Sequence, residues 1–197
     1  MTALIVGNTL SFAIESCITQ VYENLSQRAL GFFVIHVGGN SYGVHAPEAT
    51  LLACSLDAVQ RRIVRRGMHS MSFGADADAD AFKVAEAVLA VTYDEVSLDA
   101  VFFGMSCDEF RHALISSEIV WAPDGDAAFD DGGHVLQFDV GDQVRLIAFM
   151  NPVRREDVAS SLTEVWISAE EFYGCLDKWQ HQFQVEWMAA ISDTSKI

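Results

Sequence analysis

The strongest constraint on the fold is an apolar stripe near the carboxyl end of the chain. Its members recur every three or four residues, and four of the five are aromatic: Phe172, Leu176, Trp179, Phe183 and Trp187. This spacing is typical of an amphipathic helix, and Ser168 with Glu171 forms the capping-box pattern that begins one. Because a lone helix cannot bury its own stripe, a second layer must cover it. We interpret the stripe as core; an exposed binding groove is the alternative.

Runs of β-branched and aromatic residues are candidates for that second layer. They predict strands over residues 12–19, 31–37, 42–45, 134–140, 143–150 and 163–167. The turn cluster 38–41 joins the second strand to the third. Gly141 and Asp142 form a two-residue connection between the fourth and fifth strands, which predicts a hairpin. Residues 123–133 are expected to form a polar loop.

Helical spacing recurs in three further segments. From Pro47 onward, apolar residues follow at intervals of three and four and end at Gly67, which indicates an amphipathic helix. A second helix is predicted over about 77–93, with aspartates at its positive end. Ser106 and Glu109 match a capping box and predict a short third helix.

These elements favour an α+β fold over α/β. Strands arranged in hairpins and helices with one apolar face predict a mostly antiparallel sheet packed against amphipathic helices on one side. The chain has 197 residues, three prolines, and no internal repeat or linker-like stretch. We therefore expect one domain over residues 1–197.

Charge narrows the choice of partner. The chain has 28 acidic and 12 basic residues, a formal net charge of −16. Such a field repels nucleic acid and anionic membranes and speeds association with a basic partner. The alternative is that the acidity only keeps the protein soluble. The amino terminus lacks the basic region of a signal peptide, and no run reaches the length of a membrane span, so we expect a cytoplasmic protein.

Signatures of catalysis and cofactor binding are absent from the sequence. It contains no GxxxxGK[ST], GxGxxG or HExxH motif. Residues 39–43 (GNSYG) fit the letters GxSxG, but they lie in the predicted hairpin between two strands and so do not form the strand-to-helix elbow of a hydrolase. Four scattered cysteines, with no CxxC pair, indicate neither a zinc knuckle nor a disulfide framework. We predict no catalytic, metal or cofactor site.

Three weaker patterns each have a structural explanation as well as a functional one. Glu109 and His112 have the spacing of two metal ligands, but a second copy is missing and Glu109 is assigned to the capping box. The best enzymatic candidate is Cys107, which lies at a predicted helix start and could be approached by His36 or His134. The alternative is that Cys107 is a buried structural thiol. The arginines at 61, 62, 65 and 66 are explained by the helix dipole and by pairing with carboxylates.

Four short segments near the amino terminus carry a resemblance to a known family. They are 7–8 (GN), 12–15 (FAIE), 31–33 (GFF) and 39–43 (GNSYG). In this order they resemble the immunity protein 42 family. The resemblance is firmest over about the first 65 residues, and the segment 103–133 lies outside it.

The resemblance implies a binding protein rather than an enzyme. Members of the family are encoded beside polymorphic toxins, including those of contact-dependent growth inhibition systems, and protect the producing cell by binding the cognate toxin. The resemblance implies no catalytic residues in this chain. The expected partner is a basic toxin domain, bound by a monomer in a one-to-one complex.

If the toxin is a nuclease, its substrate-binding surface must be basic to hold phosphate, and an acidic immunity protein can cover it. We therefore assign the toxin-binding surface to two sets of acids: Asp76, Asp78 and Asp80, and Asp124, Asp126, Asp130 and Asp131. Calcium binding by either set is the alternative, but the ligand geometry is wrong: an EF-hand loop that begins at Asp124 would need glycine and glutamate at the positions of Phe129 and Val135.

Two other classes of protein remain open at this point. A secretion chaperone is also often a small acidic α+β protein, but it binds an extended segment of its effector and is typically a dimer. A cysteine-dependent enzyme would require a reactive thiol at Cys107.

Overall fold

The computed structural model describes residues 3–24, 27–73, 79–97, 99–121, 127–151 and 157–194. Its amino-terminal half forms an antiparallel sheet of five strands: β1 (Leu4–Asn8), β2 (Phe12–Val21), β3 (Ala29–Val37), β4 (Asn40–Tyr42) and β5 (Thr50–Leu51). The spatial order is β1-β2-β3-β4, and β5 pairs with β3. Short turns join β1 to β2 (residues 9–11) and β3 to β4 (residues 38–39).

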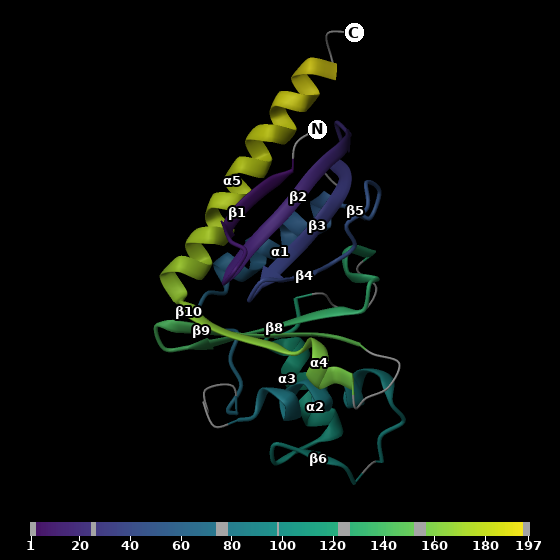
Figure 1. The fold of residues 1–197 in the computed structure, drawn as a ribbon, viewed down its shortest axis with the longest axis vertical. Helices are drawn as coiled ribbons and strands as arrows, with labels where there is room; N and C mark the ends of the chain where they lie inside the picture. Colours follow the sequence, from purple (N-terminus) through teal and green to yellow (C-terminus); the bar gives the residue numbers. More distant parts are fainter. Residues whose placement is uncertain are drawn as a thin grey trace.

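Two helices cover one face of this sheet, α1 (Leu52–Val64) behind β2 and β3 and the long α5 (Ala169–Thr194) alongside β1 and β2 (Figure 1). All five members of the stripe on α5 are buried in the core between the helices and the sheet. Trp179 is fully buried, and its indole N–H donates to Ser16 of β2 at 3.0 Å. The interpretation of the stripe as core is therefore confirmed.

A second antiparallel sheet lies beneath the first in Figure 1, with strand order β10-β9-β8. Its members are β8 (Gly133–Val140), β9 (Gln143–Met150) and β10 (Thr163–Ser168). One face, including Val135 and Leu146, belongs to the core shared with α1 and α5. The other face, including Leu136 and Phe149, belongs to a separate core. This sheet is thus buried on both faces.

The second core is closed by the remaining helices, α2 (Ala81–Tyr93), α3 (Cys107–Ser116) and α4 (Val158–Ser161). A two-stranded ribbon, β6 (Val101–Phe102) and β7 (Met105–Ser106), leads into α3. Ser106 and Glu109 bond reciprocally to each other's backbone N–H, so the predicted capping box is confirmed. The order from top to bottom in Figure 1 is helices and first sheet, second sheet, then α2 and α3.

The α+β class and the antiparallel hairpins are confirmed. The strands form two larger sheets rather than one, and the second sheet carries helices on both faces rather than on one side. Individual elements also differ from the expectation. Helix α2 begins at Ala81 rather than near 77, because Asp80 accepts a hydrogen bond from the backbone N–H of Phe82 and caps the helix there. The loop 123–133 is not polar throughout: residues 127–129 form a 3₁₀ turn, and Phe129 is buried. Strands β1, β5, β6 and β7 were not expected, and β4 spans residues 40–42 where a strand was predicted over 42–45.

Close approach between backbones explains two glycines of the amino-terminal motifs. Gly7 has φ 103°, and a Cβ there would lie 2.4 Å from the carbonyl oxygen of Phe12. Gly43 has φ 123°, and its Cβ would lie 2.8 Å from the carbonyl oxygen of Phe33. Both positions require glycine, because side chains rarely adopt this backbone conformation and have no room here.

Candidate functional site

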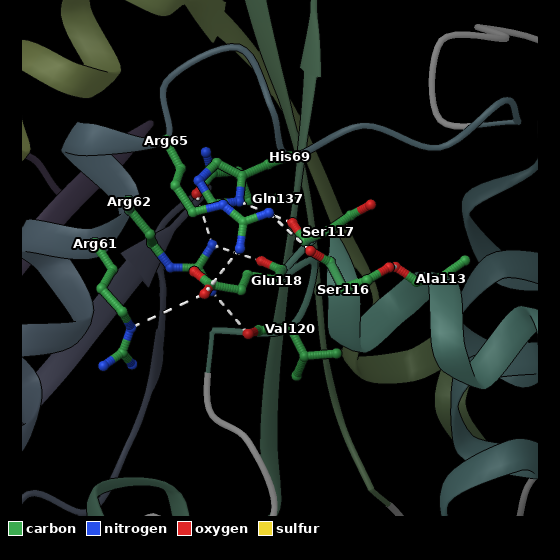
Figure 2. Close-up of polar contacts among 10 residues, drawn as sticks. All are labelled: Arg61, Arg62, Arg65, His69, Ala113, Ser116, Ser117, Glu118, Val120 and Gln137. Carbon is green, nitrogen blue, oxygen red and sulfur yellow. Dashed lines mark hydrogen bonds and ion pairs between the residues drawn. The ribbon is translucent and has the colours of Figure 1, made fainter.

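The two cores meet at a buried arginine on α1. Arg62 is 3% exposed. Its Nη1 donates to the backbone oxygen of Glu118 at 3.0 Å and to the side-chain oxygen of Gln137 at 2.9 Å, and its Nη2 donates to the backbone oxygen of Val120 at 2.7 Å. The guanidinium also stacks 4.2 Å from the ring centroid of Trp121. Figure 2 shows these hydrogen bonds between α1 and residues 118–120, a short strip of chain that follows α3.

Burial lowers the pKa of Arg62 to about 9, partly offset by the carboxylate of Glu118. The side chain therefore keeps its charge at neutral pH. A buried charge is tolerated only where hydrogen bonds replace its lost water, and three oxygens do so here. Arg62 is thus a structural cation that joins α1 to the strip 118–120 and to β8.

The neighbouring arginines have different roles. Arg65 pairs with Glu118 at 3.0 Å and donates to the backbone oxygen of Ser116 at 2.7 Å, which confirms the predicted pairing with a carboxylate. Arg61 lies 4.0 Å from Glu118, and its side chain is 58% exposed. For Arg62 the prediction of carboxylate pairing is wrong, because its hydrogen-bond acceptors are carbonyl and amide oxygens.

A second polar group extends this junction to α5. Asp139 on β8 accepts hydrogen bonds from the backbone N–H groups of Gly67 and His69 and from the hydroxyl of Tyr173 at 2.9 Å. Burial and the Asp139 carboxylate raise the pKa of the Tyr173 hydroxyl, which therefore stays protonated and donates. Burial and the charge of Arg62 lower the pKa of His69, whose Nδ1 lies 3.0 Å from the backbone oxygen of Ser117. That oxygen can only accept, so Nδ1 carries the proton.

An open groove of about 800 Å³ lies beside this junction. One wall is α1, the opposite wall is formed by the end of α2 and by α3, and residues of 118–121 and 129–134 complete it. Most of its lining is apolar, and charged side chains are also present: Arg61, Arg62, Arg111, Glu118 and Asp130. A concave, mostly apolar surface with a few polar groups is the usual form of a binding site.

The acids predicted to bind the toxin have different roles in the structure. Asp130 is exposed and lines the groove. Asp131, although exposed, accepts hydrogen bonds from the backbone N–H groups of Gly43 and Gly133, both at 2.9 Å. Asp80 caps α2. Asp131 and Asp80 therefore support the fold whatever else they contact. The other four members, Asp76, Asp78, Asp124 and Asp126, lie outside the described residues.

The histidines named for Cys107 are engaged elsewhere. His36 lies 2.9 Å from a carboxylate oxygen of Glu15, and His134 lies 3.2 Å from the hydroxyl of Tyr93. Cys107 is half-buried at the first position of α3. Within the described ranges, no group of three or more His, Cys, Asp or Glu side chains could hold a metal ion. No helix in the same ranges is both long and apolar enough to cross a membrane.

Neither the groove nor the structural role of Arg62 was predicted from the sequence. The groove walls come from α1, α2 and α3, whose arrangement follows from packing on the second sheet. An arginine within the apolar face of the helix was the available signal: Arg62 follows Val59 at an interval of three. A charged residue on a buried face needs internal partners.

Comparison with known proteins gives one family and one similar structure. The family model described as immunity protein 42 matches residues 4–182. The crystal structure of CdiI from Burkholderia dolosa AUO158 is similar with a TM-score of 0.56 and 16% identity, covering 91% of this chain and 99% of that chain. At this identity the likeness shows the fold alone. No curated protein sequence matches the chain significantly.

Replacing Arg62 by alanine should lower the free energy of unfolding by about 3–5 kcal/mol, because it leaves buried oxygens without a donor. Arg61→Ala removes a neighbouring arginine that is mostly exposed and should change it by less than about 0.5 kcal/mol. Urea unfolding followed by tryptophan fluorescence measures both. Equal effects of the two substitutions would contradict the structural role of Arg62.

Asp131→Ala should destabilise the protein by about 1–2 kcal/mol, because two backbone N–H groups lose their acceptor. Asp130→Ala, one residue earlier, should have an effect within about 0.5 kcal/mol. Thermal unfolding of the two variants is the measurement. If Asp131→Ala is as stable as the unmodified chain, the Asp131 carboxylate does not stabilise the fold by linking Gly43 to Gly133.

Proposed function

Because the chain belongs to the immunity protein 42 family, we propose that it neutralises a cognate bacterial toxin by binding to it, and that it is not an enzyme. The family match over residues 4–182 is the observation that carries this proposal, because it spans both of the larger sheets and the first half of α5. The similar structure is named CdiI, and we assign the toxin to a contact-dependent growth inhibition system on that basis.

The distribution of charge supports a basic partner. Between residues 79 and 118, which include α2 and α3, only Lys83 and Arg111 oppose the following acids: Asp80, Glu86, Asp94, Glu95, Asp99, Asp108, Glu109 and Glu118. All of these acids except Glu118 are exposed. A negative surface of this kind raises the rate of association with a positive one.

A nuclease domain is the toxin class that best matches this chemistry. A nuclease must hold a polyanion, so its substrate-binding surface is rich in lysine and arginine. An acidic protein bound there excludes the nucleic acid both by occupying the surface and by repelling phosphate. We place the acids of α2, α3 and the loop with Asp130 on the toxin-facing side, with one copy of this chain bound to one toxin domain in the cytoplasm.

Co-expression tests the proposal directly. The toxic carboxy-terminal domain encoded immediately upstream should kill a host that expresses it alone and spare a host that also expresses this chain. The two proteins should co-purify as a stable complex with one copy of each. A dead host with no complex would refute the immunity role, and a stable homodimer that holds an extended segment would favour the chaperone class instead.

The contribution of the acidic loop is measured by kinetics. Replacing Asp124, Asp126 and Asp130 together by asparagine should slow association with the toxin several-fold at low salt and flatten its salt dependence, because steering is electrostatic. Asp131 is left unchanged because of its structural hydrogen bonds. The matched control removes three exposed acids that lie outside α2, α3, the acidic loop and the groove: Glu23, Asp177 and Glu186. If both triple variants slow association equally, the loop has no specific role in the interface.

A further inference from the structure

The groove beside Arg62 differs in charge from the rest of this acidic chain. Of 12 lysines and arginines in the sequence, three line it: Arg61, Arg62 and Arg111. Arg62 uses its donors on the internal oxygens described above. Arg111 donates through Nε and Nη2 to the backbone oxygen of Val91 and through Nη1 to Asp108.

Arg61 is the groove cation with the weakest internal pairing among the described residues. Its contact with Glu118 is long, at 4.0 Å, and Glu118 already pairs with Arg65 at 3.0 Å. The Arg61 side chain is 58% exposed. A guanidinium in this position can pair with a carboxylate that approaches from outside.

Apolar side chains of the groove are also exposed to solvent. Ile115 on α3 is 70% exposed and Tyr93 at the end of α2 is 49% exposed. Beneath them the lining is buried and apolar: Val88, Val91, Leu114, Trp121 and Phe129. Exposed apolar groups at the rim of an apolar hollow are typical of the positions that anchor a protein partner.

We propose that this groove is the anchor site for the toxin: it takes a large apolar side chain of the toxin, next to a toxin carboxylate that pairs with Arg61. This inference rests on the proposed function and adds the contact that holds the complex together. Asp130 lines the same groove, so the site is continuous with the acidic surface that we place against the toxin. A second copy of this chain is disfavoured as the occupant, because two chains of net charge −16 repel each other.

The two parts of the interface then affect different rate constants. The acidic surface acts over a distance and controls association. The groove acts only after contact, by burying apolar area and one ion pair, so it controls dissociation. Substitutions in the groove should therefore change the lifetime of the complex and leave the association rate nearly unchanged.

The experiment uses the full chain and the toxin domain in surface-based binding kinetics. Ile115→Ser and Arg61→Ala should each raise the dissociation rate, by about tenfold for Ile115→Ser, and change the association rate less than about twofold. Both side chains are mostly exposed, so the unfolding midpoint should not move. Met188→Ser is the control, because Met188 is an exposed apolar residue of a helix, at 57%, that does not line the groove.

Each outcome decides between the proposals. Unchanged dissociation for both variants, with binding intact, overturns the groove as the anchor and leaves the immunity function standing. No binding of the toxin by the unmodified chain overturns the immunity function itself. A dimer of the unmodified chain that Ile115→Ser dissociates, measured by sedimentation, would assign the groove to a second copy and overturn the toxin as its occupant.

Discussion

The buried guanidinium of Arg62 is the contact on which the arrangement of the molecule depends. A charge in the interior is stable only when hydrogen bonds to fixed oxygens replace its hydration, and Arg62 finds these on the strip 118–120 and on β8. That strip is itself tied to β8: the N–H of Trp121 donates to Val135, and the N–H of Gln137 donates to Ile119, both at 2.9 Å. The position of α1 relative to the second sheet is therefore set by polar geometry as well as by apolar contact.

The groove is a consequence of this junction. Helix α1 is held on one side through Arg62, while α2 and α3 pack against the opposite face of the second sheet. The walls belong to two different cores, and they leave between them a hollow that neither core fills. Its mixed lining follows from its origin, since the basic residues come mainly from α1 and the exposed Tyr93 and Ile115 from α2 and α3. An immunity protein that uses this hollow would combine a steering surface with a separate anchor.

The second sheet explains why the fold has two cores. Residues 144–150 of β9 contain one polar residue, Arg145, in an otherwise apolar run. Such a run is typical of a strand that is buried on both faces, whereas alternation is typical of a strand with one face in water. The sequence thus carried a signal that this sheet is central. In β8, the alternation of Leu136, Phe138 and Val140 predicts burial of one face only. Val135, on the other face, is as deeply buried as Leu136.

The sequence by itself determined most of the longer local elements, the fold class and the family. The spacing of the α5 stripe, the capping box at Ser106 and the two-residue turn at Gly141 depend on neighbouring residues, so their physical causes can be recognised in the chain. Only the tertiary structure decided the site. It assigned Asp131 to a hydrogen-bonding role within the fold, left Asp130 at the groove, and brought Arg62 to acceptors more than 50 residues away. These outcomes depend on which surfaces of distant segments meet, and no local pattern specifies that.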